Sequence, residues 1–139
     1  MELTRRDAFA LGAGAAALAF MPKLAWADET QTAIDAFTGG AEVAEGGVDL
    51  TTPEIAENGN TVPVEVAAEG AAAIMILATG NPRPGVATIH FGPLAAASEA
   101  KTRIRLAGTQ DVVAIAKMSD GSFAKATKAV KVTIGGCGG

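Results

Sequence analysis

The sequence of 139 residues contains one cysteine, one histidine and no tyrosine. A zinc, haem or iron–sulfur centre needs several soft ligands, so a site of this kind made by this chain alone is excluded. With a single cysteine, the chain has neither an internal disulfide nor a Cys-x-x-Cys redox pair. We therefore expect no cofactor and no resident metal.

Basic residues are also scarce. Eleven lysines and arginines stand against 15 acidic residues, a net charge of −4, which argues against nucleic-acid binding. Residues 28–69 hold ten acidic and no basic residues, whereas residues 70–139 hold eight basic and three acidic ones. This segregation fits either a solvated acidic face or oppositely charged lobes that orient partner proteins.

No apolar run is long enough to span a bilayer. The run Ala8–Met21 has 14 residues, fewer than the roughly 20 that a transmembrane helix needs. It follows Arg5 and Arg6 and precedes small residues at 25 and 27, which predicts an export signal over residues 1–27, cleaved after Ala27. The paired arginines resemble a twin-arginine signal, but the aromatic residue stands one position late, which keeps a general secretory route open. Either route ends outside the cytoplasm, and we expect no membrane segment in the mature form.

Residues 28–134 make one domain. A short helix is expected over Thr30–Phe37, ended by Gly39 and Gly40. About seven strands separated by turns follow, which predicts an all-β, immunoglobulin-like sandwich. The strands are expected near Val48–Leu50 and at Thr61–Glu69, Ala71–Thr79, Val86–Phe91, Thr102–Ala107, Gln110–Met118 and Ala129–Ile134.

Two of these strands have distinctive patterns. In Thr61–Glu69 apolar residues alternate with Pro63 and Glu65, which indicates a half-buried edge strand, because proline cannot donate to a sheet hydrogen bond. Ala71–Thr79 is continuously apolar and is predicted to be a central strand.

The most informative segment is the C-terminal one, residues 135–139, which reads Gly135, Gly136, Cys137, Gly138 and Gly139. Glycines give the backbone wide conformational freedom, and the cysteine has no bulky neighbours in sequence to cover it. We expect an arm with an exposed thiol that, fully extended, reaches about 15–20 Å beyond the last strand and fits a narrow cleft in another protein.

Cys137 lacks the surroundings of a catalytic cysteine. A nucleophilic cysteine needs a neighbouring base or a helix N-terminus. His90, the one histidine, lies within a predicted strand and is expected to be a packed or rim residue rather than a base. The protein is therefore expected to be a carrier and not an enzyme, with no catalytic residues of its own.

The twin-arginine-like leader, the small strand-rich domain and the Gly135–Gly139 tail together resemble the SoxY family, the sulfur carriers of the periplasmic Sox thiosulfate-oxidising system. The resemblance implies that Cys137 holds thiosulfate-derived intermediates covalently and that Gly135, Gly136, Gly138 and Gly139 form a swinging arm. It further implies a heterodimer with SoxZ and transient docking to the haem enzyme SoxXA, the manganese enzyme SoxB and SoxCD.

Three alternatives remain open from the residues. Gly138-Gly139 also satisfies the minimal motif of sulfur carriers that use a terminal thiocarboxylate, although their activation is cytoplasmic. The chain could instead be an extracytoplasmic interaction module that dimerises through Cys137. Finally, the tail could be a frayed terminus whose cysteine is incidental.

Overall fold

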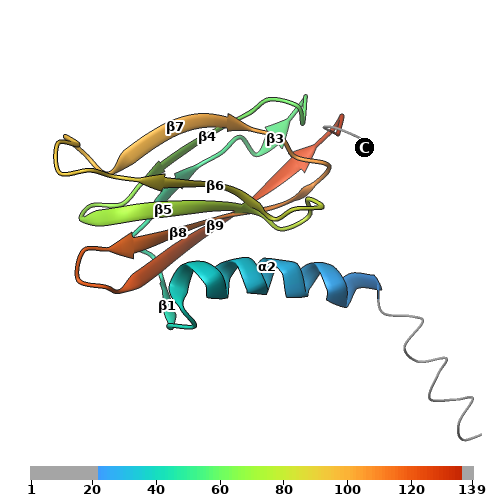
Figure 1. Cartoon of the computed structure of the whole chain (residues 1–139). Coiled ribbons are helices and arrows are strands. Elements are labelled where there is room, and N and C mark those ends of the chain that lie inside the picture. Colours follow the sequence, from blue (N-terminus) through green and yellow to red (C-terminus); the bar gives the residue numbers. More distant parts are fainter. Residues whose placement is uncertain (1–21, 136–139) are drawn as a thin grey trace, which may run out of the picture.

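The computed structural model describes residues 22–135, with side chains from Glu29 onward. Two β-sheets face each other and one helix covers the outer side of the larger sheet (Figure 1). The elements are α2 (Pro22–Thr38), β1 (Val43–Glu45), β2 (Asp49–Thr51), β3 (Ile55–Ala56), β4 (Val62–Ala67), β5 (Ala71–Ala78), β6 (Gly85–His90), β7 (Glu99–Ile104), β8 (Gln110–Met118) and β9 (Phe123–Val132).

The larger sheet has the strand order β1-β9-β8-β5-β6, with β3 also paired to β9, and the smaller sheet has the order β2-β4-β7. The predicted all-β, immunoglobulin-like sandwich with one short helix is confirmed. The described residues form nine strands rather than about seven, because β1 and β3 are only three and two residues long. Strands this short carry no readable alternation, and both exist because they pair in parallel with β9.

The main core lies between the two sheets. Val62, Val64 and Val66 of β4 are almost completely buried, and the intervening Pro63 and Glu65 are exposed. This confirms the predicted alternation of β4. From the larger sheet, the same core receives apolar side chains of β5, β8 and β9, including Ile74, Ile76, Val112, Ala114 and Val130.

The position of β4 in its sheet corrects the prediction. The sequence favoured an edge strand, but β4 lies between β2 and β7. Proline is tolerated because β2 pairs only with residues 65–67, so at Pro63 the strand has β7 as its one neighbour. The proline therefore marks a local edge within a central strand. The predicted central position of β5, between β6 and β8, is correct.

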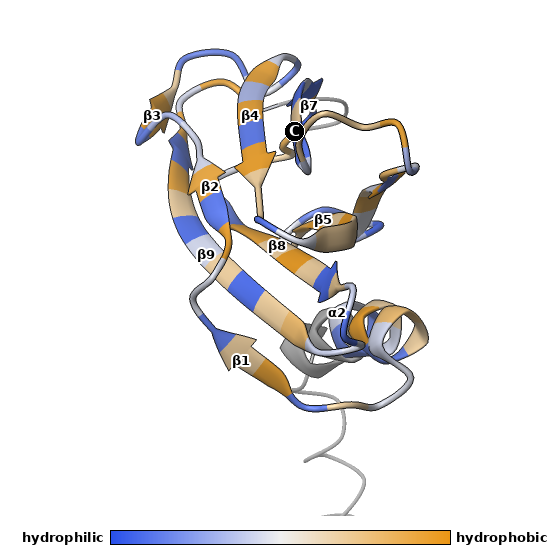
Figure 2. Cartoon of the chain, turned by 90° about the vertical axis from the view of Figure 1, so that its left-hand side faces the viewer, coloured by the Kyte–Doolittle hydropathy of each residue, from blue (hydrophilic) through white to orange (hydrophobic). Residues whose placement is uncertain are grey.

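Two strands begin earlier than predicted. β7 begins at Glu99 instead of Thr102, and β9 begins at Phe123 instead of Ala129. The first part of β9 contains lysines and a threonine, which hide its strand character in the sequence, and Figure 2 shows hydrophilic and hydrophobic bands alternating along it. Pairing with β8 over residues 123–130 fixes the full length of the strand.

Helix α2 packs on the outer face of the larger sheet, away from β4 and β7 (Figure 1). Its Ala33, Ile34 and Phe37 contact a second core cluster made by Met75, Leu77, Val113, Ile115 and Phe123. The rings of Phe37 and Phe123 meet edge to face, with centroids 5.9 Å apart. The helix begins at Pro22 rather than Thr30, and it ends where predicted, at Gly39 and Gly40 with φ of 67° and 82°.

Strand pairing mixes charges that the sequence keeps apart. Lys125 Nζ lies 3.3 Å from Glu45 Oε1, between β9 and β1, and Lys101 Nζ lies 3.2 Å from Glu65 Oε1, between β7 and β4. Both pairs join a basic residue of the second half of the chain to an acidic residue of the first. Exposed pairs of this kind stabilise the fold little, but they bring opposite charges together at these two places.

The β8–β9 turn is stabilised by its own side chains. Ser122 donates two hydrogen bonds to Asp120 Oδ1, from its backbone N at 2.8 Å and from its hydroxyl at 2.6 Å. The bond from the Ser122 hydroxyl is the main reason why the pKa of Asp120 is lowered, and the backbone bond adds to it. Gly121 completes the turn with φ of 89°.

Candidate functional site

The described chain ends beside β3, at the end of the sandwich where β9 stops (Figure 1). We call this region the arm root, and define it as residues 131–135 together with residues 54–59. Gly135, the first residue of the predicted arm, belongs to it and is half-buried. Gly136, Cys137, Gly138 and Gly139 lie outside the described residues, as do Arg5 and Arg6.

Backbone bonds continue past the end of β9. The Lys131 N–H donates to Glu54 O at 2.9 Å, and the Thr133 N–H donates to Ala56 O at 3.0 Å. The Thr133 hydroxyl donates to Glu57 O at 2.9 Å. Residues 54–57 therefore hold the chain in an extended path for one residue beyond the last residue of β9.

A buried glycine makes the final attachment. The Gly59 N–H donates to Ile134 O at 2.7 Å, while Gly59 O accepts a bond from the N–H of fully buried Leu106 at 2.8 Å. Through Gly59, the backbone of Ile134 is tied to the core. In the sequence, Asn58-Gly59 is a dipeptide typical of turns, and no pattern in it signals a contact with residue 134, 75 positions later.

A threonine in the β7–β8 loop supports the same segment from another side. The Thr109 hydroxyl accepts a hydrogen bond from the Val132 N–H at 3.0 Å and lies 3.4 Å from Val132 O. With residues 54–59, this contact surrounds the end of β9 with polar partners. The direction in which the chain leaves the domain is thus set by the fold.

These contacts fix the point from which the arm begins. The expected reach of about 15–20 Å counted the whole arm from Ile134, the predicted end of the last strand, and the backbone is held as far as that residue. Cys137 is the third residue after that anchor, and three fully extended residues span at most about 10 Å. A pocket that receives Cys137 must therefore come close to the arm root.

His90 lies far from the arm root. It is the last residue of β6, is exposed, and pairs with Ala73 near the beginning of β5. Because β9 runs parallel to β5, the end of β9 lies at the opposite end of the sandwich. The rim position proposed for His90 agrees with this placement. Within residues 22–135, no group of three histidine, cysteine, aspartate or glutamate residues is arranged to hold a metal.

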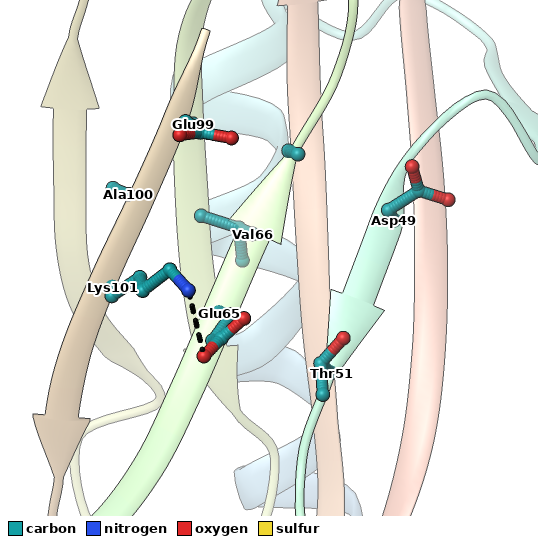
Figure 3. A pocket seen from close by; sticks show the side chains of 8 residues that line it. Asp49, Thr51, Glu65, Val66, Glu99, Ala100 and Lys101 are labelled. Carbon is teal, nitrogen blue, oxygen red and sulfur yellow. Dashed lines mark ion pairs between the residues drawn. The ribbon is translucent and has the colours of Figure 1, made fainter.

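A shallow hollow of about 230 Å³ lies on the outer face of the smaller sheet (Figure 3). Its polar lining includes three carboxylates, Asp49, Glu65 and Glu99, and one amine, Lys101, which is already paired with Glu65. An excess of negative charge disfavours anionic ligands such as thiosulfate. The hollow extends to residues 66, 67, 99 and 100, towards the end of the sandwich opposite the arm root, and contributes nothing to a site around Cys137.

Comparison with known families decides the identity of this scaffold. A family model described as "Sulfur oxidation protein SoxY" matches residues 34–137, a range that ends on Cys137. The chain belongs to the SoxY family. The solved structure of the sulfur carrier protein SoxY from Chlorobium limicola f thiosulfatophilum is 36% identical, with a TM-score of 0.68. The match covers 78% of this chain and 99% of that SoxY chain.

More distant structures share only the fold of this SoxY-family chain. Superoxide reductase (neelaredoxin) from Ignicoccus hospitalis is 17% identical over 63% of this chain and 80% of its own, with a TM-score of 0.55. At this identity the likeness concerns the sandwich alone. No curated protein sequence matches significantly. Among the described residues, no helix has the length and apolar character to cross a membrane.

Proposed function

We propose that this SoxY-family chain is a sulfur carrier of the Sox system and that Cys137 is the attachment site. The observation that carries the proposal is the family match, which extends to the single cysteine of the chain. The arm root supports it, because the domain fixes the backbone up to Ile134 and leaves the thiol three residues beyond.

The proposed chemistry balances without a cofactor in this chain. The Cys137 thiol loses its proton to solvent and its sulfur forms an S–S bond with the outer sulfur of thiosulfate, giving Cys–S–S–SO3⁻, while two electrons pass to the haem enzyme SoxXA. Water then cleaves the bond to the sulfonate sulfur on the manganese enzyme SoxB, which releases sulfate and leaves Cys–S–SH. Where SoxCD is present, it oxidises the remaining sulfane sulfur of Cys–S–SH to a sulfonate, with the oxygen atoms taken from water, the protons released to solvent and the electrons passed to SoxCD.

A short tether has a physical advantage in such a sequence of reactions. An intermediate held on the carrier does not diffuse away between enzymes, and a short flexible linker gives effective concentrations in the mM range at a docked site. The glycines at 135, 136, 138 and 139 have no side chains to widen the arm. We propose that the carrier is a heterodimer with SoxZ and that the other Sox enzymes dock transiently.

Intact mass spectrometry tests the attachment site. We expect the protein purified from cells supplied with thiosulfate to be heavier by one S2O3 group, and fragmentation to place the added mass on Cys137. Dithiothreitol should remove it, and the Cys137→Ser variant should never acquire it. Added sulfur on the Gly139 carboxyl would identify a thiocarboxylate carrier instead, and a disulfide-linked dimer without adduct would identify an interaction module.

The export signal is part of the proposal. Cleavage after Ala27 would divide α2, but Ala33, Ile34 and Phe37, the helix residues that contact the sheet, all follow the cleavage point. The mature domain, residues 28–134, therefore keeps both core clusters, and the protein is proposed to act in the periplasm.

Replacing Arg5 and Arg6 with lysines tests the route. The twin-arginine route requires the paired guanidinium groups, so we expect the precursor to accumulate in the cytoplasm and periplasmic SoxZ to fall with it. Immunoblots of periplasmic and cytoplasmic fractions measure both proteins. Undiminished export of both subunits would show that the chain uses the general secretory route.

A further inference from the structure

Large apolar side chains are exposed at three described positions: Ile55 is 58%, Ile134 is 67% and Leu94 is 98% exposed. Two of the three belong to the arm root. Ile55 pairs with Lys131 of β9, and Ile134 carries the last anchored carbonyl before the arm. Leu94 lies at the other end of the sandwich, in the loop between β6 and β7.

The fold does not require isoleucine at either position of the arm root. On β3 it is Ala56, 5% exposed, that enters the core, and Ile55 points away from it. Ile134 binds Gly59 through its backbone, a bond that any residue other than proline could make with its carbonyl equally well. Isolated exposed apolar residues are common on protein surfaces, so exposure alone gives these two no function.

The chain between Ile134 and Cys137 is short. Cys137 follows Ile134 by three residues, which span at most about 10 Å. An enzyme that encloses the thiol and its cargo must place the mouth of its pocket within that distance of Ile134. The anchor is a short hydrogen bond from buried Gly59 to Ile134. The arm can become longer only if this hydrogen bond breaks.

We propose that Ile55 and Ile134 form an apolar docking surface for the rim of the pocket that takes up Cys137. The occupant is the mouth of a Sox enzyme pocket, with apolar groups facing the two isoleucines. This inference rests on the carrier function proposed above. One surface serves successive enzymes, because each must approach the same arm from the same side. The bonds at Glu54, Ala56 and Gly59 hold the surface in place before docking, which lowers the entropy cost of binding.

Charge substitutions test the surface. We expect Ile134→Asp, and more strongly Ile134→Asp combined with Ile55→Asp, to lower kcat/KM for the carrier at least about tenfold with purified SoxB and with purified SoxXA, since a buried apolar contact is replaced by a desolvated charge. Leu94→Asp is the matched control, because it makes the same change at an exposed apolar residue remote from the arm, and it should leave kcat/KM unchanged. Thermal unfolding of each variant verifies that the domain is intact.

Reaction of Cys137 with iodoacetamide separates docking from thiol chemistry. We expect Leu94→Asp to be alkylated at the rate of the unchanged protein, and the two variants that contain Ile134→Asp at the same rate or more slowly, because the small reagent needs no docking and a nearby carboxylate disfavours the reactive thiolate. Faster alkylation of Ile134→Asp would overturn the proposal, since it would show that residues 136–139 themselves cover the isoleucines. Equal kcat/KM for Ile134→Asp and Leu94→Asp would also overturn it.

A longer arm gives an independent test. Three glycines inserted between Gly135 and Gly136 would let Cys137 enter a pocket that does not touch the arm root. In the protein with the insertion, we expect Ile134→Asp to lower kcat/KM less than it does without the insertion. An equal effect with and without the insertion would contradict the proposal that the short arm forces the enzyme to contact Ile134. If Cys137→Ser retained turnover, the carrier function itself would fail, an outcome distinct from failure of the docking surface.

Discussion

Replacing Cys137 with serine is expected to reduce thiosulfate turnover by the complete Sox system to the level without carrier. A serine hydroxyl cannot form the S–S bond that would hold the cargo, and the chain has no second cysteine to replace it. Cys137 is the third residue after the last anchored one, Ile134, and we expect its thiol to contribute nothing to the core, so the free energy of unfolding should change by less than about 0.5 kcal/mol.

Turnover and thermal unfolding measured on the same preparation check both halves of this expectation. Cys137→Ala is the matched control, because it also removes the sulfur but leaves no hydroxyl, and it should behave like the serine variant. Retained turnover in either variant would refute the carrier role. A loss of turnover accompanied by unfolding would refute the separation between thiol and scaffold.

Truncating Ile76 to alanine is expected to lower the free energy of unfolding by about 3–4 kcal/mol. Ile76 lies at the centre of β5, is completely buried, and packs in the core between the two sheets. The substitution removes apolar contacts and leaves a cavity that strands paired on both sides cannot readily close. Urea denaturation followed by circular dichroism measures the loss.

Ile55→Ala is a matched control for Ile76→Ala. Ile55→Ala removes the same atoms from a side chain that is 58% exposed, and it should change the free energy of unfolding by no more than about 0.5 kcal/mol. At temperatures where Ile76→Ala is still folded, its Cys137 should accept thiosulfate as before. An equal loss in the free energy of unfolding for the two variants would show that burial of Ile76 between the sheets does not stabilise the domain.

The strands could be read from sequence where burial imposes a simple pattern. Val62, Val64 and Val66 alternate with exposed residues, and Ile74–Leu77 form a continuous apolar run, so β4 and β5 were predicted nearly to their ends. The first half of β9 could not be predicted, because its lysines expose their amines while the backbone pairs with β8. Pro63 misled the prediction of an edge strand, since the sequence does not show that β2 stops short of it.

Folding brings together charged residues that are separate in the sequence. The sequence separates acidic from basic residues along the chain, yet Glu45 and Glu65 each lie beside a lysine from the other half. Sequence distance is no guide to spatial distance in a sandwich, where strands pair across long intervals.

By itself the sequence determined which reactive side chains this protein has: one thiol, with glycines on both sides of the cysteine, and one imidazole. Composition and local spacing suffice for such conclusions because they concern which atoms are present. The sequence placed the beginning of the arm after Ile134, but only the tertiary structure decided which contacts fix it there. The anchor at Ile134 depends on a hydrogen bond from Gly59 and on the fixing of Gly59 by Leu106, contacts between residues far apart in the chain that no local pattern records.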